Sequence, residues 1–278
     1  MTMSAAVKSR KVATERLARA HYTDAWLYDR RYGRRSVDIA YYSALAKKAK
    51  RVLELGAGTG RITLPLARAG VEVVAVEREQ ALIGRLRARL ARESLATQRR
   101  VTIVHDDFRT LRKTRGRFPL VIAPFNALSH CYDARTLAQV LAVIRTRLAP
   151  GARFAFDVPL PCPETLAYDP DRRYRVGNAT GSDRTRYAYY ESFEYDAAAQ
   201  TLLIVAHYDR IDPRTKKPRP NDQRSFVLPL LHRMHFPQEL ALVLDAAGFS
   251  IVSHAGDFAG APLTGDADSQ VIVAKRAK

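Results

Sequence analysis

Residues 51–60 hold the chain's most informative pattern, a short apolar run followed by glycines at alternating positions 56, 58 and 60. A helix-like stretch, 61–68, comes next. Glycines in such a turn let the backbone bend sharply and let a ligand lie against bare peptide. A dinucleotide fingerprint, G-x-G-x-x-G, would need a glycine where this chain has Arg61. An acidic residue, Glu54, also precedes the loop. The pattern predicts a binding turn that differs from the dinucleotide one.

Carboxylates also follow the next two predicted strands. The β-branched run 71–76 ends in Glu77, and the run 101–104 leads into Asp106 and Asp107. A carboxylate at the tip of the second strand of a Rossmann-like unit can accept hydrogen bonds from both ribose hydroxyls. Glu77 therefore predicts an adenosine ribose, although dinucleotide enzymes use the same device. As the alternative, the glycines form only a turn and the carboxylates only cap helices.

The pattern E-x-G-x-G-x-G resembles the first motif of class I S-adenosylmethionine-dependent methyltransferases. In that family an acidic residue after the third strand meets the adenine amine and its neighbour borders the ring, which implies these roles for Asp107 and Phe108. Asp106 is read as a helix cap or a solvated residue. The resemblance implies S-adenosyl-L-methionine as cofactor, with these binding residues: Glu54, Gly56, Ala57, Gly58, Gly60, Arg61, Glu77, Arg78, Asp107, Phe108 and Phe125.

Strand and helix patterns alternate from residue 51 to about 158, which indicates a parallel sheet with right-handed crossovers. Three alternating runs between 184 and 234 indicate an antiparallel sheet inserted after strand five, and a helix and two strands follow. The predicted fold is α/β, a Rossmann-like seven-stranded methyltransferase sheet with an inserted antiparallel β-sheet. The predicted domains are an N-terminal helical and aromatic lid (1–36), a cofactor-binding core (37–158), a β insertion capping the substrate (159–232) and a C-terminal completion of the core sheet (233–278).

The segments 236–263 and 269–270 resemble a subfamily of bacterial small-molecule N-methyltransferases. It includes amino-sugar N,N-dimethyltransferases and relatives of the glycine/sarcosine enzymes, and the likeness covers roughly residues 22–276. By this resemblance His130 is the general base or the partner of the substrate amine. Its alternative role is a helix-capping or surface histidine. The resemblance also makes Tyr22 the second predicted catalytic residue, with a place over the methyl donor or the substrate amine.

Aromatic faces attract a sulfonium or an ammonium, so the N-terminal tyrosines are candidate substrate contacts, with a plain hydrophobic lid as the alternative. On the inserted strands, alternation places Tyr190 on the opposite face from Tyr189, so at most one of them faces the pocket. The predicted substrate-binding residues are Tyr28, Tyr32, Asn126, Tyr189 and Tyr208. No metal ligand set is predicted. Because the methyl donor is already activated, no covalent nucleophile is expected either.

Composition is that of a globular protein, with 278 residues, 47% hydrophobic and 27% charged, and a formal net charge of +18. Two cysteines, no signal-peptide core and no membrane-spanning apolar run predict a cytoplasmic protein without membrane contact. Arginine runs are scattered without forming a compact cluster. The charge fits a solvated surface of a protein from a high-GC genome, an acidic small substrate, or nucleic acid. A basic amphipathic helix is expected over 4–20.

The leading prediction is therefore an S-adenosylmethionine-dependent methyltransferase that acts on a small molecule, most directly on an amine nitrogen, with a homodimer considered. The alternative is an RNA-directed methyltransferase or RNA-binding protein that uses the basic surface. Ala123-Pro124-Phe125-Asn126 lacks the [N/D/S]-P-P-[Y/F/W] tetrapeptide that enzymes acting on nucleobase amines often carry. A third reading is an idle regulatory subunit, although the cofactor carboxylates are intact.

Overall fold

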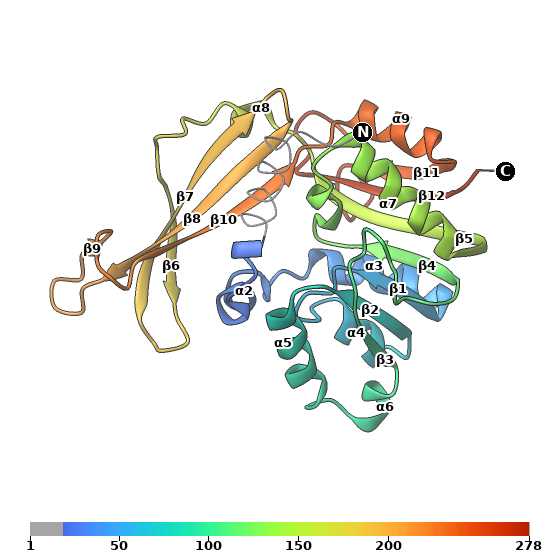
Figure 1. The fold of residues 1–278 in the computed structure, drawn as a ribbon, viewed down its shortest axis with the longest axis horizontal. Helices are drawn as coiled ribbons and strands as arrows, with labels where there is room; N and C mark the ends of the chain where they lie inside the picture. The colour runs from blue at the N-terminus through green and yellow to red at the C-terminus, as the bar shows by residue number, and fades with distance from the viewer. Residues whose placement is uncertain (1–18, 278) are drawn as a thin grey trace, which may run out of the picture. The chain divides into compact units, whose positions relative to one another are not determined.

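The structure, a computed structural model, describes residues 19–277 and divides the chain into two compact units (Figure 1). The smaller unit combines the described part of 1–34 with Pro163–His232, and the larger combines Arg35–Cys162 with the chain from Arg233 onward. The basic helix expected over 4–20 lies almost wholly outside the described residues. The lid and the insertion, predicted as separate domains, share one unit here.

The larger unit is built on a seven-stranded sheet with the order β11-β12-β5-β4-β1-β2-β3. The pairs β1–β2, β2–β3, β1–β4 and β4–β5 are parallel, whereas β12 runs antiparallel to both β5 and β11. Parallel neighbours bring the carboxyl ends of β1, β2, β3 and β4 to one edge. The strands are β1 Arg51–Leu55, β2 Glu72–Glu77, β3 Val101–His105, β4 Phe118–Ala123, β5 Leu148–Pro159, β11 Phe249–Ala255 and β12 Ser269–Arg276.

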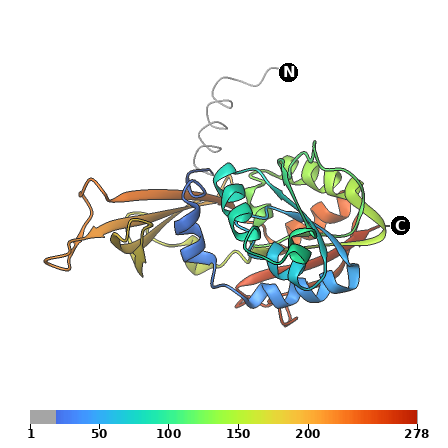
Figure 2. The same cartoon turned by 90° about the horizontal axis from the view of Figure 1, so that it is seen from below.

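Helices cover both faces of this sheet, as the turned view shows (Figure 2). One buried cluster joins the sheet to α7 (Ala134–Arg147) and α9 (Pro237–Ala246), through side chains such as Leu141 and Leu244. The other joins it to α3 (Val37–Ala49), α4 (Thr63–Arg68) and α5 (Gln80–Leu90), through Tyr42, Leu64 and Leu86. Short helices α6 (Leu95–Gln98) and η1 (Ala127–His130) complete the unit. The sheet is therefore buried on both faces, which explains its near-continuous apolar strands.

The smaller unit is an antiparallel sheet with the order β10-β8-β7-β6, with β9 paired to β8. Helix α2 (Ala25–Tyr32) begins at Asp24, whose carboxylate accepts hydrogen bonds from the backbone N–H groups of Trp26 and Leu27. Leu27 packs into a cluster with Tyr187, Tyr189 and Tyr208. The remaining elements are α8 Pro163–Leu166, β6 Tyr174–Thr180, β7 Arg186–Asp196, β8 Thr201–Ile211, β9 Pro218–Arg219 and β10 Phe226–Arg233.

The predicted fold class is confirmed, since a seven-stranded methyltransferase-type sheet carries an inserted antiparallel sheet after its fifth strand. The three alternating runs expected between 184 and 234 are observed as β7, β8 and β10, and the helix and two strands expected after them as α9, β11 and β12. Strand β6 was not predicted, because its segment of small and charged residues lacks clear alternation. Among the described residues no helix is both long and apolar enough to cross a membrane.

Candidate active site

The glycine loop after β1 is shaped by backbone conformations that side chains disfavour. Gly56, Gly58 and Gly60 have φ angles of 71°, 58° and 84°. The carbonyl of Val76 on β2 accepts hydrogen bonds from the N–H groups of Gly56 and Ala57, each 2.9 Å long. A Cβ added to Gly56 would lie 3.5 Å from the Cβ of Ala127 in η1. Bare backbone therefore faces the segment that follows β4.

Glu77 lies at the tip of β2, beside this loop. Its carboxylate accepts hydrogen bonds from the backbone N–H groups of Gly58, Arg78 and Glu79, each at 2.8 Å. Burial raises the pKa of Glu77, although these N–H donors act against the rise. The register pairs Glu77 with His105 at the end of β3. The carboxylate predicted to bind ribose therefore also holds the glycine loop in place, through its hydrogen bond with Gly58.

Glu54 lies within β1 and is 1% exposed. The Thr63 hydroxyl, in the first turn of α4, donates a hydrogen bond of 2.6 Å to its Oε2 atom. Burial raises the pKa of Glu54 to about 7, while the Thr63 hydrogen bond and the charge of Arg61 act in the opposite direction. Glu54 therefore joins the strand before the loop to the helix after it. A direct contact of this carboxylate with cofactor stays a prediction.

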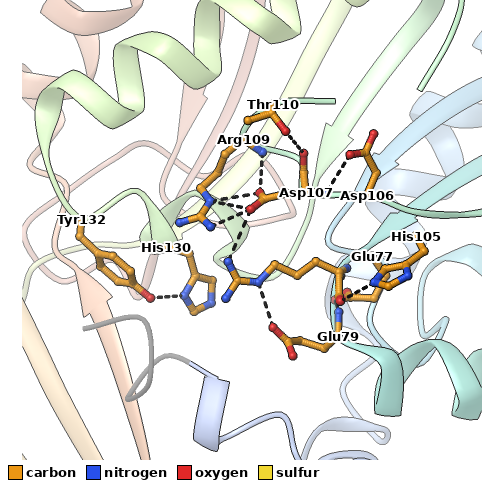
Figure 3. Close-up of polar contacts among 10 residues, drawn as sticks. Glu77, Glu79, His105, Asp106, Asp107, Arg109, Thr110, His130 and Tyr132 are labelled. Carbon is orange, nitrogen blue, oxygen red and sulfur yellow. Dashed lines mark hydrogen bonds and ion pairs between the residues drawn. The ribbon is translucent and has the colours of Figure 1, made fainter. Parts of the chain in front are cut away.

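Asp107 follows β3 and lies in a network of charged side chains (Figure 3). Arg109 donates to it through Nε at 3.0 Å and Nη2 at 2.7 Å, and the Nη1 atom of Arg78 lies 3.6 Å from Oδ2. Burial alone would raise the pKa of Asp107, but the Arg109 hydrogen bonds and the charges of both arginines hold it below its usual value. A carboxylate whose pKa is lowered suits the role of acceptor for an adenine amine, with the guanidinium of Arg109 as a neighbour.

Asp106 has a different role from Asp107. Its Oδ2 atom accepts hydrogen bonds from the backbone N–H groups of Lys113 and Thr114, at 2.7 and 3.1 Å, and its Oδ1 from that of Asp107 at 2.9 Å. The side chain is 8% exposed. Asp106 therefore holds the loop after β3, and both roles expected from the sequence, a helix cap or a solvated residue, are wrong because the carboxylate is buried in a loop.

Arg61 is committed to an ion pair within the larger unit. It donates to both carboxylate oxygens of Asp38 on α3, at 2.6 Å each, and its guanidinium lies 4.9 Å from the ring centroid of Phe125. The structure thus brings two predicted cofactor residues, Arg61 and Phe125, into contact. The contact of either residue with the cofactor stays a prediction.

His130 ends η1 and is half-buried. Its Nδ1 atom lies 2.9 Å from the hydroxyl of Tyr132, and the two rings meet edge to face (Figure 3). The Nη1 atom of Arg233 lies 3.5 Å from the carbonyl oxygen of Tyr132. If Nδ1–H donates to Tyr132, the Nε2 atom is left as an acceptor, which is the tautomer a general base needs.

The predicted aromatic substrate residues belong to the smaller unit. Tyr28 contacts both Tyr22 and Tyr32, and all three rings contact the buried His21, whose Nε2 lies 3.0 Å from the Tyr32 hydroxyl. Tyr189 and Tyr208 stack at 5.1 Å. The guanidinium of Arg31 lies over the rings of Tyr32 and Tyr189, at 5.0 and 4.7 Å. The cation that contacts the faces of these two rings is therefore Arg31, a residue of the protein itself.

Tyr190 has other partners than Tyr189, as alternation along β7 requires. The guanidinium groups of Arg173 and Arg175 lie 4.7 and 5.0 Å from the centroid of its ring. The roles proposed for Tyr22, Tyr28, Tyr32, Tyr189 and Tyr208 stay predictions.

Sequence reasoning missed two carboxylates that hold this site together. Asp157 on β5 accepts hydrogen bonds from the N–H groups of Phe125 and Asn126, and Asp38 pairs with Arg61. Asp157 had a signal, since it is a lone carboxylate inside the apolar run 154–158. A carboxylate there must find donors when buried. Asp38 had none, because an aspartate in the first turn of a helix is ordinary.

The site residues fit an S-adenosyl group. The glycine loop offers close backbone approach, Glu77 offers an ionisable acceptor beside it, and Asp107 offers a second at the neighbouring strand end. Within residues 19–277 no group of three His, Cys, Asp or Glu side chains is placed to hold a metal ion.

Part of the chain matches a known family of domains. Residues 52–151 match the methyltransferase domain family. Ribosomal RNA small subunit methyltransferase A of Streptomyces coelicolor is 36% identical over 112 residues, which are 36% of this chain and 39% of that protein. The chain thus spans about two fifths of the length of such curated relatives.

Two solved structures extend over most of the chain. The CcbJ methyltransferase from Streptomyces caelestis has a TM-score of 0.73 at 26% identity, with 94% of this chain and 99% of that chain covered. The glycopeptide N-methyltransferase MtfA, in complex with (S)-adenosyl-L-methionine, has a TM-score of 0.58 at 20% identity, covering 86% and 87%. This chain is therefore a class I methyltransferase in fold. Residues 52–151 match a methyltransferase domain, which confirms the predicted enzyme class, and MtfA was solved with the methyl donor that the sequence of this chain predicts.

Proposed function

We propose that this chain transfers a methyl group from S-adenosylmethionine to the amine nitrogen of a small molecule. The observation that carries the proposal is the juxtaposition, in one unit, of the Glu77-braced glycine loop with the segment ending in His130. Support also comes from MtfA, which is described as an N-methyltransferase of a glycopeptide. Cytoplasmic location and homodimer formation stay predictions.

The chemistry asks little of the protein besides orientation. When bound, the cofactor supplies a methyl group already activated by its sulfonium. The substrate nitrogen forms a bond to the methyl carbon with its lone pair, the carbon–sulfur bond breaks, and S-adenosylhomocysteine leaves. The nitrogen must be neutral at attack, so one proton is lost before or after transfer. His130 is proposed to take that proton on Nε2, with Tyr132 fixing the ring through Nδ1.

A label-transfer screen tests the proposal. Purified protein is incubated with methyl-labelled S-adenosylmethionine and a panel of amino sugars and other amines, alcohols, thiols and RNA, in parallel with calorimetric titration of S-adenosylhomocysteine and NAD. We expect S-adenosylhomocysteine to bind, NAD not to bind, and label to appear on an amine. If label appears only on an alcohol oxygen, on a thiol sulfur or on RNA, the proposal that the acceptor is a small-molecule amine is wrong.

A second candidate function is methylation of RNA. Two observations favour it, the formal net charge of +18 and the likeness of residues within the core to ribosomal RNA methyltransferases. The segment after β4 counts against it, because Ala123-Pro124-Phe125-Asn126 lacks the polar residue and second proline of nucleobase N-methyltransferases. Binding of RNA that falls steeply with salt, together with label on RNA, would favour this function. Salt-sensitive binding of RNA without transfer of label to it would count against RNA methylation. The positive charge would then be a general property of the surface.

A further inference from the structure

Two consecutive residues after β4 have left-handed backbones although neither is glycine. Phe125 has a φ angle of 54° and Asn126 one of 61°. L-residues visit this region at an energetic cost, which is larger for an aromatic residue than for asparagine. Such conformations persist where the surrounding structure imposes them. They lie directly before η1, the short helix that ends in His130.

Asp157 supplies the groups that impose this conformation. It lies on β5, the parallel neighbour of β4, and is 2% exposed. Its Oδ1 atom accepts the N–H of Phe125 at 2.9 Å, and its Oδ2 atom accepts that of Asn126 at 3.3 Å. Two successive N–H groups therefore point at one carboxylate, an arrangement that favours an anion. An asparagine at this position would offer one acceptor atom in place of two.

Other groups of the same unit hold the segment from further sides. The buried hydroxyl of Tyr42 on α3 donates to the Oδ1 atom of Asp157 at 2.6 Å, which fixes the carboxylate. The ring of Phe125 lies under the Arg61 guanidinium. The Nε2 atom of the buried His235 lies 3.1 Å from the carbonyl oxygen of Leu128 within η1. The segment is thus fixed at its backbone, at one ring and at its far end.

We propose that Asp157 is a positioning residue for methyl transfer, which holds Phe125 and Asn126 in the left-handed conformation and thereby aims the segment carrying Asn126 and His130 at the acceptor. This inference rests on the proposed function, since it assigns a purpose to the segment. Asp157 itself touches neither donor nor acceptor. Its effect is on orientation, for which small displacements have large consequences in rate.

The main variant is Asp157→Asn, studied in the full chain. We expect the rate constant kcat to fall at least about tenfold, while the dissociation constant for S-adenosylhomocysteine rises by a clearly smaller factor, because the glycine loop and Glu77 are untouched and only the predicted cofactor contact of Phe125 is affected. Amide hydrogen exchange at Phe125 and Asn126 should become faster. Tyr42→Phe, which keeps the carboxylate and loses one donor, should shift the same quantities less and serves if Asp157→Asn does not fold.

Two controls separate positioning from general loss of stability. Ile144→Ala removes buried volume on α7, outside residues 125–130, and should lower the melting temperature while kcat stays near wild type. Asn126→Gly makes the left-handed conformation easier, so Asp157→Asn should reduce kcat by a smaller factor in the Asn126→Gly background than in wild type. An equal factor in both backgrounds would overturn the proposal.

Three further outcomes test the inference or the proposed function on which it rests. A folded Asp157→Asn protein with wild-type kcat overturns the inference, and so does unchanged exchange at Phe125 and Asn126. If the wild-type protein methylates no acceptor, the proposed function fails. Amide hydrogen exchange at Phe125 and Asn126 then still tests whether Asp157 fixes the segment. Failure of the inference about Asp157 can therefore be distinguished from failure of the proposed function.

Discussion

Arg61 and Asp38 form a buried two-point ion pair, in which Nη1 meets Oδ1 and Nη2 meets Oδ2 at 2.6 Å each. The Asp38 side chain is fully buried and that of Arg61 is 9% exposed. The Nη1 atom of Arg61 also donates to the carbonyl oxygen of Arg35 at 3.0 Å. Because Arg61 directly follows Gly60, the pair ties α3 to the end of the glycine loop.

Breaking this pair from one side should destabilise the protein strongly. Asp38→Asn leaves a buried guanidinium without its counter-charge, so the free energy of unfolding should fall by about 3–5 kcal/mol. Urea unfolding followed by circular dichroism measures it. The exposed pair between Arg68 and Glu93 is the matched control, because it also has two hydrogen bonds, through the Nε and Nη2 atoms of Arg68. Glu93→Gln should cost about 1 kcal/mol or less. Equal losses of unfolding free energy in Asp38→Asn and Glu93→Gln would contradict the prediction that burial makes the Arg61–Asp38 pair more costly to break.

Two glycines with the same backbone conformation should respond differently to alanine. Gly60 and Gly70 have φ angles of 84° and 88°, but a Cβ on Gly60 would overlap Leu86 of α5, while one on Gly70 would meet nothing within 4 Å. Gly70→Ala should therefore cost about 1–2 kcal/mol for the backbone alone. Gly60→Ala should cost about 1–3 kcal/mol more through overpacking. Equal losses in urea unfolding would mean that Leu86 moves aside freely.

The sequence predicted the larger sheet well because its signals are local. Strand β2 is a run of β-branched residues ended by Glu77, and α9 begins at Pro237 and is followed by Gly248, which are ordinary boundary signals. The glycines at positions 56, 58 and 60 indicated the binding loop correctly. Their φ angles are positive, and glycine adopts such angles at a lower cost than other residues do.

The contacts that organise the site were beyond prediction because they join residues far apart in the chain. Asp157 reaches Tyr42 across 115 positions, and Arg61 reaches Asp38 from a different element. Periodicity predicts which face is buried but not which donor meets a buried acceptor. Arg61 is a further example, because the sequence does not show that it pairs with Asp38 and lies over Phe125, while its contact with the cofactor stays a prediction. Tertiary packing decides such pairings.

Glu54 should make stability depend on pH in a defined direction. Its pKa is about 7 in the folded protein because of burial, and about 4.3 when unfolded. Between these values the folded state holds a proton that the unfolded state has released. Its stabilising contribution is therefore complete below about pH 4.3 and is lost as pH rises to 7, amounting to about 3 kcal/mol.

Glu54→Gln should remove this dependence, so the difference between variant and wild type in free energy of unfolding should grow between about pH 5 and pH 7 in favour of the variant. Urea unfolding at several pH values measures it. Glu93→Gln is the control, because its carboxylate has a lowered pKa from pairing with Arg68 and is ionised in both states over this range. A constant difference for Glu54→Gln would contradict the raised pKa.

Glu77 should matter more for cofactor affinity than its neighbour Glu79. Glu77→Gln exchanges a charged acceptor for a neutral one at the predicted ribose contact, so binding of S-adenosylhomocysteine should weaken by about 1.5–3 kcal/mol. Calorimetric titration measures it. Glu79→Gln removes a carboxylate that accepts from the Nε atom of Arg78 at 2.9 Å, and should leave affinity nearly unchanged. Unchanged affinity in Glu77→Gln would place the ribose contact elsewhere.

His130 should be needed for turnover but not for cofactor binding. As the proposed base it must be neutral, so turnover should rise with pH until both the histidine and the substrate amine have lost their protons. His130→Ala should lower turnover by about 10²-fold or more, the usual contribution of general base catalysis. Affinity for S-adenosylhomocysteine should stay near wild type, because Glu77 and the glycine loop are unchanged.

Tyr132→Phe separates the ring's orientation from its chemistry. This variant keeps the aromatic edge-to-face contact but loses the hydroxyl 2.9 Å from Nδ1 of His130. Turnover should fall less than in His130→Ala, because the base remains but its tautomer is no longer fixed. Steady-state rates across pH, with calorimetry on each variant, measure both effects. Wild-type turnover in His130→Ala would leave orientation alone as the catalytic device. Loss of cofactor binding or of folding in that variant would instead make His130 a structural residue of η1.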